Sequence, residues 1–299
     1  MSWLQDAWDW IVDHIPFIGS SGIGSSVERI EITKMVYAPL FYPKRGVTTC
    51  KAVGDVDGTW DWLKKSDEDR AWAIAWIKAH APAGTQPMVT FLLSSSGNDG
   101  GIMGGGTSIN DSALSAARDV CVATIKEGVA LAGTLYCDDA DPRWRDIAKH
   151  ATAWQTVNEK LGNLLSVALL SIESDEKEDD VNAKNISAGV AKVKEYFPDV
   201  PLKGTHMQFH KRSASGTYAW IGWVTNPTGC DVMFMEFPWN MGFGNGDVEG
   251  VAGVQRDYPV IAPRMNTKVC WQEINLNPTG PVAKAQTQWL LAQKPWGVG

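Results

Sequence analysis

The sequence lacks the cysteine patterns that build metal sites or disulfide frameworks. Its five cysteines are an odd number, lie far apart and contain no Cys-x-x-Cys pair. This excludes a zinc ribbon and a complete set of intrachain disulfides. Most of them stand in apolar runs, as Cys121 and Cys270 do, and such a setting predicts small buried core residues.

Basic charge is also scarce. The chain carries 27 Lys and Arg residues against 34 Asp and Glu, for a net charge of -7. It has no long run of lysine or arginine, so the electrostatic footprint of a nucleic-acid-binding protein is missing. We therefore expect no nucleic-acid partner.

Long apolar runs and export signals are missing as well. No stretch approaches the ~20 consecutive apolar residues of a membrane span. The first residues show neither the basic start nor the small-residue cleavage pattern of a signal peptide. We expect no membrane span, and a protein that is cytoplasmic, released by lysis, or incorporated into a particle such as a bacteriophage virion.

Motifs for nucleotide binding and acyl transfer are absent too. The glycine-rich passage 97–106 lacks the lysine and hydroxyl residue of a phosphate-binding loop and does not run directly into a helix, which favours a loop at the rim of the fold. No G-x-S-x-G elbow and no cysteine nucleophile signature occurs. We expect no cofactor and no acyl-enzyme chemistry.

The N-terminal segment, residues 1–18, is predicted to form a short amphipathic helix. Its apolar residues recur at helical spacing at Trp3, Leu4, Ala7, Trp8, Ile11 and Ile15. A Gly/Ser linker over 19–27 separates this helix from a single domain over 28–299. The helix either covers the bottom of its own domain or anchors the chain to a partner or to another copy.

From about residue 27 onward, β-rich apolar runs alternate with helical patterns. Strands are predicted near 28–37, 87–95, 129–137, 164–173, 202–209, 230–236 and 267–274, and helices over 69–80, 111–127, 142–161, 181–196 and 282–293. This alternation and the chain length predict an α/β fold, a TIM-like (β/α)8 barrel that is irregular or incomplete. The eighth strand is sought at 218–224 or 258–263, and an open doubly wound sheet is the alternative fold.

Carboxylates end several of the predicted strands. Glu173, Glu236 and Glu273 each close an otherwise apolar run, where a glutamate is a poor helix cap and its burial is costly unless it is paired or used. Two carboxylates facing each other across a cleft hydrolyse glycosidic bonds. These three glutamates are therefore the predicted catalytic residues, while Asp138 either caps a helix or binds a substrate hydroxyl. The alternative for the glutamates is structural pairing with Lys34, His206, His210 or Arg264.

This pattern resembles the barrel glycoside hydrolases, in which an acid/base glutamate ends the fourth strand and a nucleophilic glutamate ends the seventh. The resemblance implies that Glu173 is the acid/base and Glu273 the nucleophile. Glu236, on the sixth predicted strand, can replace either member of this pair. Ile172 stands where the family has an asparagine before the acid/base residue, and the resemblance covers strand order rather than a long motif.

Tryptophan is abundant, with 15 in the chain, and indole faces stack well on sugar rings. We therefore expect a glycan or polysaccharide partner. The predicted substrate-binding residues are Tyr37, Asp138, Gln208, His210, Trp239 and Trp271. Tryptophans within the helical patterns are expected to pack in the core instead; they are Trp60, Trp62, Trp72, Trp76, Trp154 and Trp289.

Two further functions fit the same sequence. One is a non-catalytic barrel that binds glycans or proteins, as a structural or adhesive component of a particle anchored by residues 1–18. The other is a metal-assisted hydrolase that uses His206, His210, Asp138 and Glu236, although this spacing is not diagnostic of a metal site and we expect none.

Overall fold

The long strands of the chain are parallel and close into a barrel. The computed structural model describes residues 27–47, 56–94, 109, 111–138, 151–173, 180–207, 229–240, 255, 258–259, 267–274 and 281–299. The strand order is β1-β10-β9-β8-β7-β6-β5-β4, and β1 pairs with β4 to complete the ring. These strands are β1 (Val36–Tyr37), β4 (Gln86–Ser94), β5 (Ala130–Asp138), β6 (Val167–Glu173), β7 (Leu202–Met207), β8 (Val232–Asn240), β9 (Lys268–Ile274) and β10 (Gly297–Val298).

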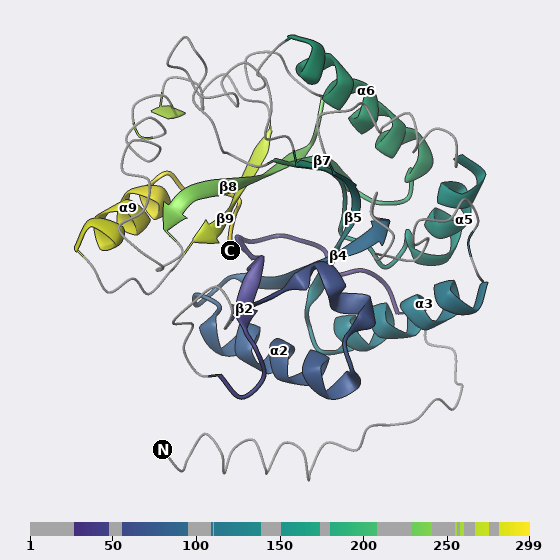
Figure 1. Cartoon of the computed structure of the whole chain (residues 1–299), viewed down its shortest axis with the longest axis horizontal. Helices are drawn as coiled ribbons and strands as arrows, with labels where there is room; N and C mark the ends of the chain where they lie inside the picture. The colour runs from purple at the N-terminus through teal and green to yellow at the C-terminus, as the bar shows by residue number, and fades with distance from the viewer. Residues whose placement is uncertain are drawn as a thin grey trace.

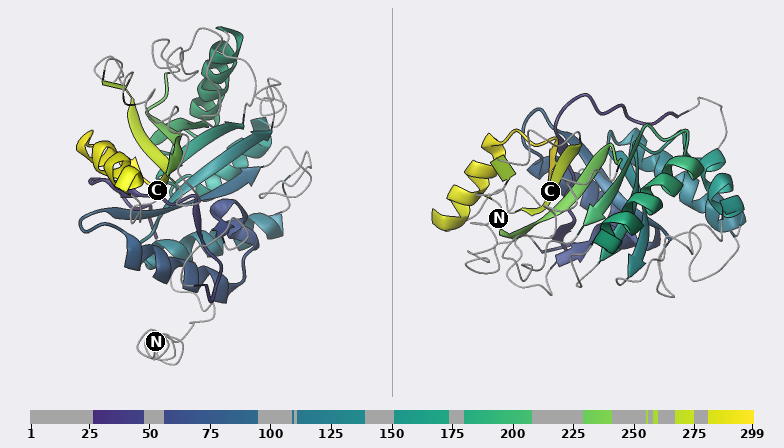
Figure 2. Two further views of the ribbon diagram at one scale, coloured as in Figure 1. Left: turned by 60° about the vertical axis from the view of Figure 1, so that its left-hand side comes forward. Right: turned by 90° about the horizontal axis from the view of Figure 1, so that it is seen from above.

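Helices surround the barrel, as Figure 1 shows along the barrel and Figure 2 from two other sides. They are α2 (Asp67–His80), α3 (Asp111–Lys126), α5 (Ala151–Leu161), α6 (Asp180–Tyr196) and α9 (Pro281–Ala292). A short antiparallel pair, β2 (Phe41–Pro43) with β3 (Val56–Gly58), and the 3-10 helix η2 (Thr59–Lys64) lie between β1 and α2. The predicted α/β barrel is confirmed, and the alternative open sheet is wrong. None of the helices described is long and apolar enough to cross a bilayer.

The eighth strand is the two-residue β10 near the end of the chain. Val36 and Tyr37 of β1 pair with it on one side, and Cys270 and Trp271 of β9 pair with it on the other. The structure places this strand at neither predicted location: Tyr258 and Pro259 are helical, and the segment 218–224 lies outside the described residues. Gly297 fits because a Cβ there would lie 2.7 Å from the Cys270 sulfur, so closure depends on a residue without a side chain.

Successive residues along each strand belong alternately to the barrel interior and to the outer face that the helices cover. The interior cluster contains strand residues and Ala38: Val36, Ala38, Met88, Ala130, Ala132, Val167, Leu169, Val232, Phe234 and Cys270. The larger outer cluster joins the opposite strand positions to helix residues such as Ile77, Leu114 and Trp154. This alternation follows from the two-residue period of a strand, and it assigns each strand position to one face.

Residues 27–34 close the amino-terminal end of the barrel. They are not part of the first strand, although the sequence predicts a strand near 28–37. Ile30 and Ile32 pack against the interior cluster together with Leu202 and Trp296. The backbone N–H of Arg29 donates to the Asn163 carbonyl at 2.8 Å. The bottom of the barrel is thus filled by this segment. The predicted helix over 1–18 and most of its linker lie outside the described residues, so the anchor stays a prediction.

The predicted core roles of the cysteines and helical tryptophans are confirmed where side chains are described. Cys121, Cys230 and Cys270 are buried. Trp62 and Trp154 are buried, and the partly buried Trp72, Trp76 and Trp289 pack against the outer cluster. The side chains of Cys50, Cys137 and Trp60 and the glycine-rich passage 97–106 lie outside the described part of the structure.

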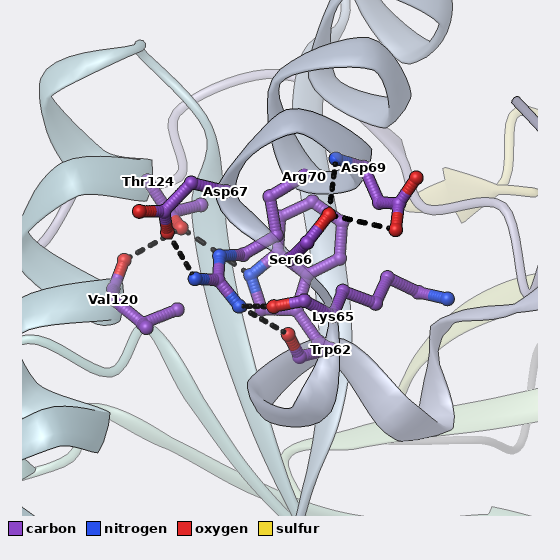
Figure 3. Close-up of polar contacts among 8 residues, drawn as sticks. All are labelled: Trp62, Lys65, Ser66, Asp67, Asp69, Arg70, Val120 and Thr124. Carbon is purple, nitrogen blue, oxygen red and sulfur yellow. Dashed lines mark hydrogen bonds and ion pairs between the residues drawn. The ribbon is translucent and has the colours of Figure 1, made fainter. Parts of the chain in front are cut away.

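Side-chain caps fix the start of α2, as Figure 3 shows. The backbone N–H of Asp69 donates to the Ser66 hydroxyl oxygen at 3.1 Å, and Arg70 binds the carbonyls of Trp62 and Lys65. The Trp62 indole donates to the Thr124 hydroxyl of α3 at 3.3 Å. These contacts tie η2 to two neighbouring helices.

Replacing Ser66 by alanine is expected to lower the free energy of unfolding by about 1 kcal/mol, because the Asp69 amide loses its acceptor. Urea denaturation of wild type and Ser66→Ala measures the loss. Ser66→Asp is the control: it keeps a capping oxygen, so it should retain most of the stability. Equal losses in the two variants would mean that the cap contributes nothing.

Candidate functional site

The carboxyl ends of the barrel strands bring together most of the predicted acidic positions. Asp138 ends β5 and Glu173 ends β6, and the two residues are register partners across these strands. Glu236 on β8 is the register partner of Gln272 on β9. Since all barrel strands are parallel, these positions share one end of the barrel, where barrel enzymes build their sites.

The alternation of the strands separates Glu173 and Glu236 from Glu273. On β6 and β8 the interior residues are Leu169 and Phe234, so positions 173 and 236 fall in the interior series. On β9, Cys270 is interior, whereas Val269 and Trp271 belong to the outer cluster. Position 273 therefore falls in the outer series. The side chains of these glutamates and of Asp138 lie outside the described part of the structure.

Two register irregularities occur near this end of the barrel. One falls between Glu236 and Asn240 of β8, where Asn240 pairs with Ile274 of β9. The other falls between Leu92 and Ser94 of β4. Irregularities of this kind end regular pairing and re-aim side chains, and they are frequent next to active sites.

A buried polar chain crosses the interior just below the strand ends. The Ser171 hydroxyl of β6 lies 3.0 Å from Nδ1 of His206 on β7. The Gln272 side chain of β9 lies beside His206, and its Nε2 donates to the Ala38 carbonyl after β1 at 3.3 Å. All three side chains are buried. These buried side chains thus bring β6, β7 and β9 together with the residue that follows β1.

His206 is neutral at physiological pH. Burial lowers its pKa to about 4, and the neighbouring Gln272 side chain, which raises the pKa, opposes this shift only in part. The imidazole has 1% exposure, so it belongs to the interior and not to the rim. Among the described residues no group of three or more His, Cys, Asp or Glu could hold a metal ion. The metal-assisted reading therefore has no support from the described part of the chain.

The structure does not bring Tyr37 and Trp271 to the mouth of the barrel. Tyr37 is 5% exposed and packs in the outer cluster, and its burial raises the pKa of the phenol. Trp271 is fully buried and meets the Tyr258 ring edge to face at 5.5 Å. Neither ring presents a face on which a sugar can stack, which corrects the prediction that they bind substrate.

The remaining predicted substrate-binding positions are only partly described. Trp239 lies on β8 beyond Glu236, and its side chain is outside the described part of the structure. Gln208 and His210 follow β7 and lie outside the described residues.

Sequence reasoning missed Ser171 and Gln272 as members of the site. Each is a polar residue inside an apolar strand, two residues from Glu173 and one from Glu273 respectively. A buried polar side chain needs a hydrogen-bond partner, so a polar residue within an apolar strand is the feature that could have identified Ser171 and Gln272. Which partner it finds depends on the register of neighbouring strands, which the sequence does not specify.

No family model matches the chain, and no curated protein sequence matches it. Among solved structures, the chain is similar to an apo β-glucosidase 1317, with TM-score 0.47 and 11% identity over 88% of this chain and 83% of that one. It is also similar to a psychrophilic glycoside hydrolase family 10 endo-β-1,4-xylanase, with TM-score 0.44 and 10% identity over 70% and 76%. A sugar phosphate isomerase/epimerase from Parabacteroides distasonis gives TM-score 0.41 and 10% identity over 91% and 97%. The barrel assignment itself rests on the strand pairing described above.

Proposed function

We propose that this chain is a glycoside hydrolase-like barrel that acts on a polysaccharide or cell-wall glycan at the carboxyl ends of its strands. The observation that carries the proposal is the shared position of Glu173 and Glu236. Both fall in the interior series of their strands at the same end of a closed parallel barrel. Two carboxylates at one such end are the groups that glycosidic bond hydrolysis needs.

In this mechanism Glu173 donates a proton to the leaving oxygen of the glycosidic bond. The second carboxylate either attacks the anomeric carbon or activates a water molecule. Glu236 is the favoured second carboxylate, because Glu273 falls in the outer series of β9 with Val269 and Trp271. Carboxyl groups ~5 Å apart would produce retention of configuration, and a separation of ~6.5–9.5 Å would produce inversion.

Sugar release from a panel of bacterial and plant polysaccharides tests this function. Wild type is expected to release reducing sugar, and Glu173→Gln is expected to lower the rate by about 10³-fold, because the amide cannot donate the proton. Glu195→Gln is the matched control. It makes the same chemical change in the exposed 2.6 Å ion pair with Lys192 on α6, away from the strand ends, and should act like wild type.

Two outcomes contradict the proposal. Undiminished release by a folded Glu173→Gln variant would remove Glu173 from the chemistry. If wild type releases no sugar from any polysaccharide, the proposed hydrolase function is wrong. Calorimetric titration with the same glycans would then test the non-catalytic glycan-binding alternative. Circular dichroism of each variant confirms that it is folded.

A further inference from the structure

We propose that His206 is a positioning residue, which holds the strand ends that carry Glu173 and Glu236 in their working geometry through Ser171 and Gln272. This inference rests on the proposed function and deepens it. His206 does not touch substrate, because it is buried in the barrel interior below the strand ends. Its role is exerted through the two side chains that it contacts.

The first contact fixes β6. The 3.0 Å hydrogen bond between Ser171 and Nδ1 of His206 joins register partners on β6 and β7. Ser171 lies two residues before Glu173 and in the same interior series of the strand. Any rotation or slip of this strand end must therefore break a fully buried hydrogen bond.

The second contact fixes β8 and β9. The Gln272 side chain lies beside His206, and its amide Nε2 donates to the Ala38 carbonyl at 3.3 Å. Gln272 is the register partner of Glu236, at the last regular pair before the irregularity of β8. The buried group around His206 therefore lies at the level of the barrel where Glu236 makes the last regular pair of β8 with β9.

A neutral imidazole suits this role because it has one donor and one acceptor nitrogen. Burial keeps His206 uncharged at physiological pH. The titratable groups on the strands around it include the buried thiol of Cys270 on β9, whose pKa is raised by burial. Asp138, Glu173 and Glu236 follow further along β5, β6 and β8, and Lys203 and Lys268 lie nearer the starts of β7 and β9. An apolar side chain of similar size would fill the space but leave the buried Ser171 hydroxyl without this partner.

Titration of the glutamate carboxyl groups tests the inference without any substrate. We would label the glutamate side chains with ¹³C, identify the signals of Glu173 and Glu236 from their glutamine variants, and follow them with pH. His206→Leu and Ser171→Ala are each expected to move the midpoint of at least one of the two signals by about half a pH unit, because the strand ends relax. The exposed Glu195 signal should stay in place and serves as the internal control.

Kinetics on the substrate found above give the second readout. His206→Leu is expected to lower kcat by about tenfold to a hundredfold with little change in KM, as a small displacement of a catalytic group does. His206→Asn keeps a short hydrogen-bonding side chain and should recover most of kcat. A role in packing alone would lower the melting temperature and leave kcat of the folded fraction unchanged.

The two readouts separate the failure of this inference from failure of the proposed function. Shifted carboxyl midpoints without sugar release by wild type would keep the positioning role and reject the hydrolase. Unchanged midpoints in the variants would overturn the positioning role whatever the activity. If His206→Leu does not fold, Ser171→Ala carries the test, because it removes a single hydroxyl from the same chain of contacts.

Discussion

Glu236→Gln is expected to lower sugar release by about 10³-fold, as strongly as Glu173→Gln, whereas Glu273→Gln should keep a rate within about threefold of wild type. The reason is the strand alternation. Position 236 follows Phe234 in the interior series of β8, but position 273 follows Trp271 in the outer series of β9. Initial rates for the three variants on one polysaccharide measure the difference.

Glu236→Gln and Glu273→Gln are a matched pair, because each removes one glutamate charge and the two positions lie on the neighbouring strands β8 and β9. A collapse of activity in Glu273→Gln with activity retained in Glu236→Gln would reverse the assignment. It would show that β9 departs from regular alternation after Gln272, and it would restore the fourth-strand and seventh-strand pair of the barrel glycoside hydrolases. The melting temperature of each variant controls for loss of the fold.

Gly204→Ala is expected to destabilise the protein by more than about 3 kcal/mol. Gly204 lies in the middle of β7, two residues before His206, and a Cβ there would come within 1.9 Å of the Val232 carbonyl oxygen of β8. That neighbour is backbone in a paired strand, so it cannot move without breaking the barrel. Urea denaturation followed by far-UV circular dichroism measures the loss.

Gly133→Ala in β5 is the control for this substitution. Its Cβ would meet the Leu93 Cδ1 atom at 2.8 Å, and the end of a leucine side chain can turn away. We therefore expect a loss of about 1 kcal/mol. Similar losses in the two variants would mean that the close approach of β7 and β8 does not limit stability.

The sequence predicted the regular parts of the barrel well, because they carry strong local patterns. The run that became β6 was expected at 164–173 and is observed at Val167–Glu173, and the helix expected at 181–196 is Asp180–Tyr196. Repeated alternation of such segments is sufficient to identify a parallel sheet covered by helices. Closure of that sheet was expected from the chain length and is confirmed by the pairing of β1 with β4 and β10.

The eighth strand could not be found in this way. Gly297 and Val298 form too short a segment to show any period, and the glycine argues against a strand when it is considered alone. What makes it a strand is the space between β1 and β9, which only the assembled barrel provides. The Trp296 carbonyl accepts from the Val36 amide at 2.9 Å, across almost the whole length of the chain.

The candidate site was predicted in part. The positions of Glu173 and Glu236 at the strand ends could be predicted, because the apolar runs stop there. The faces of Tyr37 and Trp271 could not, because a shift of one residue along a strand exchanges the two faces of the sheet. The buried chain from Ser171 to Gln272 was not predictable either. It depends on which strands are neighbours and at what register, and those are properties of the folded barrel.

The late position of β10 in the chain has a consequence for biosynthesis. During translation β1 is made early, but its second partner is made only when residues 297 and 298 emerge. Until then β1 and β9 each present an open edge, which is a template for pairing with other chains. Such long-range closure is also slow. The edges of β1 and β9 are therefore the places where a chain that has not yet added β10 would pair with another copy.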